Sequence, residues 1–366
     1  MANLVDTTLV DTTLVDTTLV VDANLVDTTL VDTTLVDTTL VDTTLVDTTL
    51  VVDANLVDTT LVVDANLVDT TLVVDANTTI KHLVFSGGGP AGLITYGAVK
   101  ALAHANVWSL PDIKSMYGCS IGAYLAVVVS LGYEWTWLDD YILKRPWEKV
   151  FAFTAQSFWD AYEQKGLLGE KIVLESLKPL LEAKDLPEQC TLQELYAFNH
   201  IDIHLYTTNI NSMRLTKVDL SHTTHPNLSV IKALCMSMSY PLAFTPVCID
   251  EDCFIDGGLL NNFPLNDCLT KTGCRETEVL AFKHAWIETH EKVTPDSTII
   301  DYMVFLTKKM QCEICTEDQQ VQIKNIVYCR VDGLAGFAQW LNAISTADAR
   351  TKLVEQGMAD GKRFLL

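Results

Sequence analysis

The stretch HLVFSGGGPAG, residues 82–92, joins a short apolar segment to a glycine-rich turn. The apolar segment predicts a strand over 82–86, and apolar residues at helical spacing predict a helix over 91–105. Pro90 falls near the first turn of that helix, where its missing N–H costs nothing. A strand that leads through a tight turn into a helix is the building unit of an α/β fold.

The same order recurs immediately downstream. Residues 113–117 predict a second strand, and the strongly apolar run 123–131 predicts a buried helix. Further strands are expected at 201–207, 253–256, 279–284 and 324–330, and further helices at 168–181, 191–198, 229–238 and 300–310. We therefore expect residues 78–366 to form one α/β domain, with a mostly parallel sheet sandwiched by helices.

Residues 1–77 are a separate segment built from a tandem LVDTT repeat. Leu recurs every five residues from Leu4, and the register slips by one where an extra Val enters, as at Val21 and Val52. This period fits neither a helix nor a strand. It resembles the pentapeptide-repeat pattern, in which four pentads make one coil of a square β-helix. A flexible or aggregation-prone tract is the interpretation we favour over a folded solenoid, because most pentads carry TT where that pattern has a small residue followed by Asn.

The charge of the chain excludes one broad class of partner. Lys and Arg number 25 against 47 Asp and Glu, which gives a formal net charge of −22. The repeat contains 14 Asp and no Lys, Arg or Glu, so it carries −14, and residues 78–366 carry −8. Proteins that coat nucleic acid need clustered cations to neutralise phosphates. We therefore expect no nucleic-acid partner.

The cysteines and the apolar segments bear on location and metal content. The chain opens with no basic segment followed by an apolar one, and the apolar run 121–131 is too short to span a bilayer. We expect a soluble cytoplasmic protein, with a peripheral position at membranes as the alternative. The ten scattered cysteines then favour reduced thiols. Cys312 and Cys315 have half of a zinc-site spacing, but no second pair accompanies them, so we expect no metal.

The glycine-rich turn fits two motifs. Gly87, Gly89 and Gly92 satisfy the G-x-G-x-x-G fingerprint of dinucleotide-binding folds. That interpretation requires an acidic residue at the end of the next strand, where this chain instead has a glycine-flanked serine. We therefore consider FAD or NAD the weaker interpretation and expect no cofactor. Packing alone is a further explanation for both tight turns.

The second turn has the spacing of a nucleophile elbow. It reads Gly118, Cys119, Ser120, Ile121 and Gly122. In the G-x-S-x-G elbow the serine projects from a sharp turn between strand and helix, and the glycines avoid a clash. The neighbouring loop, with Gly87, Gly88, Gly89 and Gly92, can supply N–H groups to a developing oxyanion.

A nucleophilic serine needs a base, and Asp256 is the candidate. Asp256, Gly257 and Gly258 follow a short apolar strand. A carboxylate at a strand end beside two glycines is well placed to face a cleft, although a simple Asx turn would use the same residues. A carboxylate is a weak base at neutral pH, so we expect burial to raise the pKa of Asp256.

These motifs together resemble the patatin-like phospholipase family. The glycine-rich loop, the serine elbow and the Asp-Gly-Gly motif occur in the family's order, and residues 237–246 are similar to the stretch that precedes its aspartate. The resemblance covers about residues 81–270 and leaves 271–366 as a C-terminal extension. It implies a Ser120–Asp256 dyad, hydrolysis of lipid acyl esters, a lipid or membrane-surface substrate and no metal in the chemical step. This chain departs from the family at Ala91, where many members have Arg or Lys. We therefore expect no cation at this position to stabilise the loop or bind a headgroup.

Two alternatives to this function stay open. A Ser-Asp-His triad of the α/β-hydrolase type could use Ser120, Asp256 and either His284 or His290. A non-catalytic lipid-binding or scaffold protein could also retain the fold. Neither alternative changes the expected α/β architecture.

Aromatic residues are crowded into one segment of the chain. It contains Trp135, Trp137, Tyr141, Trp147, Phe151, Phe153, Phe158 and Trp159. We favour core packing as the explanation. A lid or a membrane-contacting surface is the alternative, because Trp and Tyr suit the headgroup region of a bilayer.

Overall fold

The computed structural model describes residues 79–366 except 152–158, 160–161, 287–292, 296, 315–321 and 335–336. In the repeat it describes only the backbone of short strands between residues 7 and 61. The chain divides into two compact units, Met1–Ala76 and Asn77–Leu366.

The described strands of the repeat form two parallel three-stranded sheets, β1-β3-β5 and β2-β4-β6. Their bounds are β1 Thr7–Val10, β2 Thr13–Val20, β3 Leu25–Val31, β4 Thr34–Val41, β5 Leu45–Leu50 and β6 Thr60–Leu61. Leu25 pairs with Leu45, four pentads ahead, whereas Thr13 pairs with Thr34, one residue further, because Val21 intervenes. The strands therefore repeat with the period on which the solenoid interpretation rests, and the flexible or aggregation-prone tract that we favour stays a prediction.

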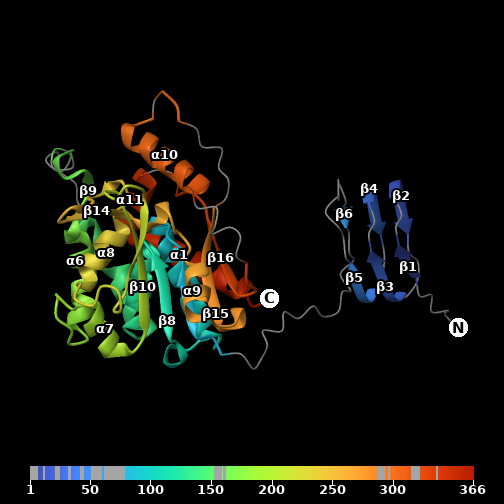
Figure 1. Cartoon of the computed structure of the whole chain (residues 1–366), viewed down its shortest axis with the longest axis horizontal. Helices are drawn as coiled ribbons and strands as arrows, with labels where there is room; N and C mark the ends of the chain where they lie inside the picture. The colour runs from blue at the N-terminus through green and yellow to red at the C-terminus, as the bar shows by residue number, and fades with distance from the viewer. Residues whose placement is uncertain are drawn as a thin grey trace. The chain divides into compact units, whose positions relative to one another are not determined.

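The second unit is built on an eight-stranded sheet in the order β13-β14-β10-β8-β7-β15-β16, with β11 paired to β10 (Figure 1). The run from β10 to β16 is parallel, and β11, β13 and β14 are antiparallel additions. The strands are β7 His82–Phe85, β8 Ser115–Cys119, β10 Asp202–Asn209, β11 Thr216–Leu220, β13 Val247–Ile249, β14 Asp252–Asp256, β15 Val279–Trp286 and β16 Ile326–Val331.

The central strands of this sheet are buried on both faces, since every residue of β7 and β8 is buried. Along β7, Leu83 and Phe85 belong to the larger apolar core, while Val84 between them belongs to a smaller core on the other face. The larger core includes residues of α1, α2, α6 and α8, and the smaller core includes residues of α9. This architecture confirms the expected α/β fold with a mostly parallel sheet.

The helices and the remaining short elements surround the sheet. The helices are α1 Gly92–His104, α2 Ile121–Ser130, α3 Trp135–Asp139, α4 Trp147–Val150, α6 Glu170–Glu182, α7 Leu192–Asn199, α8 Val230–Met238, α9 Leu265–Thr272, α10 Ile299–Ile314, α11 Phe337–Ser345 and α12 Ala347–Arg363. Short helical turns are η1 Gly89–Ala91, η2 Leu110–Asp112, η3 Asp140–Lys144, η4 Gly257–Leu259 and η5 Glu276–Glu278. A separate parallel pair joins β9 Gly166–Leu168 to β12 Leu242–Phe244.

Every strand and helix expected within 78–366 is present, with ends displaced by a few residues. Several elements were not expected, among them β11, β13, α9, α11 and α12. The sequence of α12 does not predict a helix clearly, because it is polar and contains glycines, which are poor helix formers. One of them lies at a close helix contact, since a Cβ on Gly357 would lie 1.8 Å from the carbonyl oxygen of Ile94 in α1.

The expectation that all cysteines are reduced thiols is wrong for one pair. Cys248 and Cys253 stand directly opposite each other in the β13–β14 hairpin and form a disulfide. The following described cysteines are not disulfide-bonded: Cys119, Cys190, Cys235, Cys268, Cys274 and Cys329. The side chains of Cys312 and Cys315 lie outside the described residues. No cluster of potential metal ligands occurs in the part of the chain that the structure describes.

None of the helices in the described part of the chain is both long enough and apolar enough to cross a bilayer.

Candidate active site

Ser120 stands at the turn between the end of β8 and the start of α2. Its backbone has φ 54° and ψ −125°, a conformation that is strained for a residue with a side chain. The flanking glycines make this turn possible. A Cβ on Gly118 would lie 2.4 Å from the carbonyl oxygen of Gly122, and a Cβ on Gly122 would lie 2.4 Å from that of Phe85. The predicted elbow therefore has the strand-turn-helix context that its spacing indicated.

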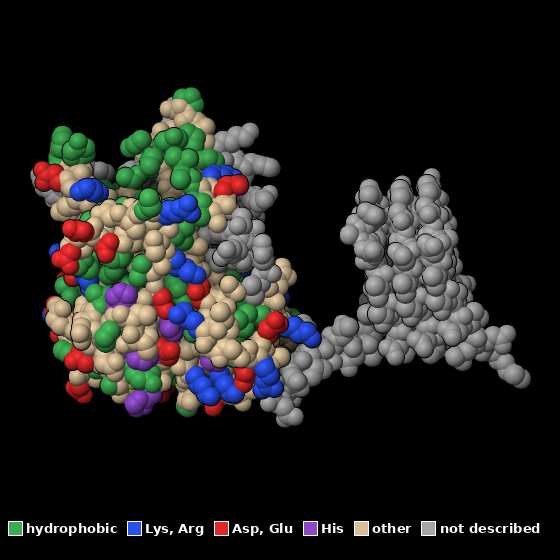
Figure 2. Space-filling model, viewed as in Figure 1, with side chains coloured by type: hydrophobic (Ala, Val, Ile, Leu, Met, Phe, Trp, Pro, Cys, Tyr) green, Lys and Arg blue, Asp and Glu red, His purple; other side chains and the backbone are tan. Residues whose placement is uncertain are grey.

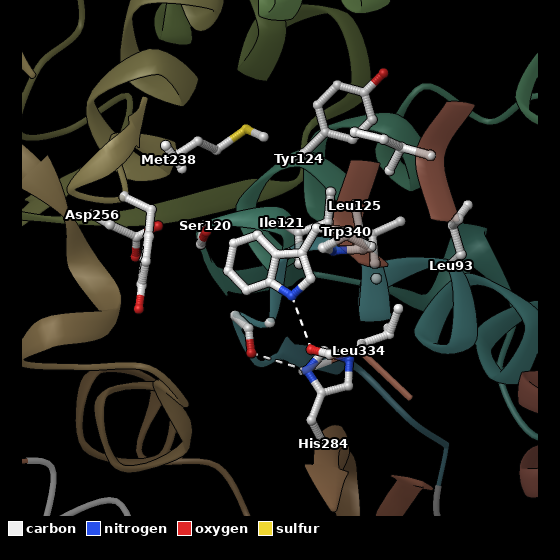
Figure 3. A pocket seen from close by; sticks show the side chains of 18 of the residues that line it. Leu93, Ser120, Ile121, Tyr124, Leu125, Met238, Asp256, His284, Leu334 and Trp340 are labelled. Carbon is white, nitrogen blue, oxygen red and sulfur yellow. Dashed lines mark hydrogen bonds between the residues drawn. The ribbon is translucent and has the colours of Figure 1, made fainter. Parts of the chain in front are cut away.

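Asp256 ends β14 and faces Ser120 across the cavity (Figure 3). Its side chain is buried, and Oδ1 accepts a hydrogen bond of 2.7 Å from the N–H of Gly258. The thiol of Cys119 lies 3.8 Å from the same oxygen. Oδ2 is buried with no hydrogen-bond partner among the described residues. The carboxylate thus keeps an unused acceptor.

Burial raises the pKa of Asp256 to about 6, and the nearby polar groups of Ser120, Gly258 and Cys119 limit the rise. No Lys, Arg or His forms an ion pair with this carboxylate among the described residues. A group with a pKa near 6 is mostly ionised at neutral pH and accepts a proton more readily than an ordinary carboxylate does. The increased basicity expected of Asp256 therefore has a structural cause.

Two serines of the stretch 237–246 hold the backbones of the two site residues. The N–H of Ser120 donates to Oγ of Ser237 over 3.0 Å, and this hydroxyl in turn donates to the carbonyl of Tyr206 over 2.6 Å. The N–H of Asp256 donates to the carbonyl of Ser239 over 2.9 Å. We call Ser237 and Ser239 the serine crossbar. The roles of these two serines were not predicted. A polar Ser237 within the mostly apolar run of α8 is the sequence signal that could have indicated one of them.

The N–H groups of the glycine-rich loop differ in whether the protein itself hydrogen-bonds them. Gly87 donates its N–H to the carbonyl of Asn262 over 2.9 Å, so this N–H is not available to a ligand. Within the described residues, the N–H groups of Gly88 and Gly89 make no hydrogen bond. Both residues line the same cavity as Ser120. The loop can therefore offer two N–H groups to an anionic oxygen.

The imidazole of His284 acts as a clamp on this loop, because it contacts the carbonyls of Gly87 and Ala91. Its Nδ1 lies 2.9 Å from the carbonyl of Gly87 and 3.1 Å from Oγ of Ser86, while Nε2 lies 3.1 Å from the carbonyl of Ala91 and 2.9 Å from Oγ1 of Thr95 (Figure 3). Burial lowers the pKa of His284. A neutral imidazole with one N–H satisfies this site if it donates to one carbonyl and accepts from one hydroxyl.

This arrangement argues against the triad that uses His284. Both ring nitrogens are occupied by loop carbonyls and hydroxyls, so neither is available to Ser120. The second histidine of that alternative, His290, lies outside the described residues. The role of His284 as a loop clamp was not predicted, because its partners are nearly two hundred residues away in the sequence.

The cavity that holds Ser120 and Asp256 has a volume of about 420 Å³. Its walls on α2, η3, α4 and α6 are mostly apolar, with Tyr124, Leu125, Ile142, Trp147 and Ile172 among the lining residues. Its charged lining residues are Asp256, Lys283, Lys308 and Arg350. A cavity of this composition suits a ligand with a hydrocarbon part and few polar atoms.

The aromatic segment is divided between interior and surface. Trp147 is buried and lines the cavity, and Trp135 packs against Tyr96 and Trp108 of the core. In contrast, Trp137 is 42% exposed and Trp159 is 72% exposed. Phe153 and Phe158 lie outside the described residues. Core packing thus accounts for only part of the aromatic segment.

A second group of exposed apolar side chains lies on α10, next to the same cavity. Figure 2 shows hydrophobic side chains gathered over this helix at the top of the view. Ile299, Tyr302, Met310 and Ile314 are its exposed apolar residues. On another face of the helix, Val304, Lys308 and Gln311 line the cavity. Helix α10 therefore forms part of the cavity wall.

Two viral proteins are similar to this chain in sequence. An uncharacterized protein, R571, of Acanthamoeba polyphaga mimivirus is 27% identical over 196 residues, which make up 53% of this chain and 64% of the viral protein. A probable lipid hydrolase, 463L, of Invertebrate iridescent virus 6 is 23% identical over 188 residues, or 51% of this chain and 62% of that protein. The chain thus spans less than two thirds of the length of either relative.

Two solved structures are also similar. VipD from Legionella pneumophila has a TM-score of 0.43 at 14% identity and covers 75% of this chain and 67% of its own. ExoU in complex with SpcU, from Pseudomonas aeruginosa, has a TM-score of 0.39 at 18% identity and covers 79% of this chain and 52% of its own.

The family comparison covers the whole site. The model of the patatin-like phospholipase family matches residues 83–269, about half of the chain, and this range includes Ser120, Asp256 and the glycine-rich loop. With the strand-turn-helix elbow and the facing carboxylate already described, this match establishes that the chain belongs to the patatin-like phospholipase family.

Proposed function

We propose that this protein is a serine hydrolase that cleaves fatty-acyl esters of lipids through a Ser120–Asp256 dyad. The observation that carries the proposal is the pairing of a strained, cavity-facing serine with a buried carboxylate that lacks a cationic partner among the described residues. Membership of the patatin-like phospholipase family and the similarity to a probable lipid hydrolase support it. The apolar walls of the cavity suit an acyl chain.

In the first half of the reaction, Asp256 accepts the hydroxyl proton of Ser120 while Oγ attacks the ester carbonyl. The N–H groups of Gly88 and Gly89 stabilise the oxyanion, at roughly 3 to 4 kcal/mol for each well-placed donor. Collapse of the tetrahedral intermediate breaks the bond to the leaving alcohol, which takes the proton from Asp256. The product of this half is an acyl-Ser120 enzyme.

In the second half, a water molecule attacks the acyl-enzyme. Asp256 removes a proton from this water, the same two N–H groups stabilise the second oxyanion, and Ser120 regains its proton as the fatty acid leaves. One carboxylate therefore serves as base and acid in turn. The crossbar residues Ser237 and Ser239 keep the two groups in register in both halves.

Covalent labelling by a fluorophosphonate tests this proposal directly. The wild-type protein should be labelled at Ser120, and the Ser120→Ala variant should not. A non-catalytic lipid-binding or scaffold protein would show no labelling and no release of fatty acid from vesicles. Labelling at another residue would also contradict the proposal.

The remaining histidine alternative needs a separate variant. His290→Ala should leave hydrolysis within about twofold of wild type, because the dyad uses no histidine. A loss of about a thousandfold would instead support a triad with His290. His284→Ala is unsuitable for this purpose, because the loss of the clamp would disturb the glycine-rich loop itself.

A further inference from the structure

The cavity is unusual in the charges that line it. Three cations, Lys283, Lys308 and Arg350, face one carboxylate, Asp256, although the chain as a whole has a formal net charge of −22. A neutral ester and two acyl chains would call for no cation. The placement and partners of these three side chains therefore indicate what else the cavity binds.

Arg350 is held by the protein itself. It is buried, and its guanidinium donates to the carbonyls of Ile344, Leu143 and Arg145 at 2.8, 2.6 and 3.0 Å. These bonds join the start of α12 to the end of α11, to η3 and to the residue that follows η3. We therefore assign Arg350 a structural role.

Lys308 is held differently. Its Nζ lies 4.3 Å from the centre of the Trp286 ring, and it forms no ion pair with any carboxylate of the described residues. A cation–π contact leaves the hydrogen-bond donors of an ammonium group unused. In a largely apolar cavity these donors have lost part of their hydration, and an anionic ligand would restore the lost interactions.

Lys308 is also close to the reacting groups along α10. Gln311, one helical turn further on, places Nε2 3.1 Å from the position that a Cβ on Gly258 would take, beside the Asp256 carboxylate. Lys283 enters the cavity from β15 on the same side, next to the clamp residue His284. The wall formed by β15 and α10 is therefore cationic, whereas the walls on α2, η3, α4 and α6 are apolar.

From this division we propose that Lys308 binds the phosphate of a phospholipid headgroup while the acyl chain lies along the apolar walls. The proposal rests on the proposed hydrolase function and adds the residue that distinguishes a phospholipid from a neutral lipid. In a glycerophospholipid the phosphate is only a few bonds from the ester carbonyl, which fits a cation that lines the same cavity as Ser120 and Asp256. Lysine acts as a point charge toward phosphate and needs no bidentate geometry.

The test compares two substrates with the same acyl chains, a phosphatidylcholine and a diacylglycerol, in mixed detergent micelles. The measured quantity is the ratio of kcat/KM for the phospholipid to kcat/KM for the diacylglycerol. Lys308→Met should lower this ratio by about tenfold or more, because a hydrogen-bonded ion pair to the phosphate is lost. Lys308→Arg should keep the ratio within about threefold of wild type, since it retains the charge.

Lys309→Met is the matched control. Lys309 neighbours Lys308 on the same helix, is exposed, and packs its Nζ 5.7 Å from the centre of the Phe305 ring, outside the set of residues that line the cavity. The substitution changes the net charge equally, so a general attraction to the micelle surface would move both variants alike. An unchanged ratio in Lys308→Met, or an equal fall in Lys309→Met, overturns the proposal.

A second arm separates a lipid headgroup from free phosphate. Glycerophosphocholine and inorganic phosphate are compared as inhibitors of the hydrolysis of a soluble acyl ester. Glycerophosphocholine should inhibit more strongly, and about tenfold more weakly in Lys308→Met than in wild type. Stronger inhibition by inorganic phosphate would overturn the headgroup assignment.

The failure of this proposal can be distinguished from failure of the hydrolase function. A wild-type protein that labels with fluorophosphonate and hydrolyses both lipids, with a ratio insensitive to Lys308, removes only the headgroup site. Absence of labelling and of all lipid hydrolysis removes the proposed function itself.

Discussion

Two carboxylate sites lie beside strand β10, and their surroundings shift the pKa values of their carboxylates in opposite directions. Asp256 pairs with Thr207 of β10 and has no cationic partner among the described residues. Three residues away on that strand, His204 lies between Asp202 and Asp219, with ring nitrogen to oxygen distances of 3.1 and 2.8 Å. Lys271 lies 2.8 Å from Asp219 on its other side. We call the second group the His204 cluster.

The partners decide the protonation of each site. Burial alone would raise the pKa of Asp219 and lower that of His204, but the hydrogen bonds and charges between them dominate. As a result the pKa of Asp219 is below its ordinary value, and the pKa of His204 is raised to about 9. At Asp256 burial dominates, and the pKa rises to about 6. The same residue type therefore serves as an ion-pair partner at one site and as a candidate base at the other.

The largest difference between the sites is expected in activity. Asp256→Asn should lower kcat for ester hydrolysis by roughly a thousandfold, because the loss of a general base costs about 10² to 10⁴. Asp219→Asn should leave kcat, measured on the correctly folded fraction, within about threefold of wild type. Comparable losses in both variants would contradict the assignment of separate roles.

The same two substitutions should change the free energy of unfolding in opposite directions. Asp219→Asn should lower the free energy of unfolding by about 1.5 to 3 kcal/mol, because it removes one of the two carboxylates that pair with the buried His204 imidazolium. Asp256→Asn should raise it by about 1 to 2 kcal/mol at pH 7, because a carboxylate whose folded pKa is raised destabilises the fold when ionised. Urea denaturation of both variants measures the two signs, and a loss of stability in Asp256→Asn would count against an unpaired buried carboxylate.

The dependence on pH sharpens the comparison further. In the proposed mechanism Asp256 acts in its ionised form, so kcat/KM should rise with pH and level off above an apparent pKa of about 6. For the His204 cluster, a folded pKa raised from 6.5 to about 9 gives stability that is complete below pH 6.5 and lost as the pH rises through 9. Unfolding free energies measured over this range should fall in wild type and change less in His204→Gln.

The smallest effect should follow from removal of the repeat. Both carboxylate sites lie within Asn77–Leu366, so deletion of residues 1–76 should leave ester hydrolysis and the pH profile within about twofold of the full chain. Because the repeat is strongly acidic, its removal should improve binding to anionic vesicles, measured by sedimentation. A truncated protein without activity would mean that the repeat supports the catalytic unit.

Sequence reasoning located the parts of the site that depend on local geometry. Ser120 and the glycines around it were predictable because a strand, a tight turn and a helix are encoded by neighbouring residues. Asp256 was predictable for the same reason, since it ends an apolar strand beside two glycines. The fold class followed from repetition of these units along the chain.

The remaining features depend on contacts between distant segments. The clamp joins His284 to the carbonyl of Gly87, and the Cys248–Cys253 disulfide depends on a hairpin register that composition does not fix. The position of Lys308 in the cavity wall required the packing of α10 against the turn that follows Asp256. The His204 cluster draws its members from β10, β11 and α9, and no short motif marks it.

The serine crossbar has a consequence for how this scaffold can diversify. Ser237 and Ser239 hold the backbone N–H groups of the proposed nucleophile and base and lie in and directly after α8, whereas most of the residues that line the cavity come from other elements. The contacts that set the spacing of Ser120 and Asp256 are therefore largely separate from the residues that line the cavity. Substitutions of lining residues can change which lipid is bound without changing this spacing.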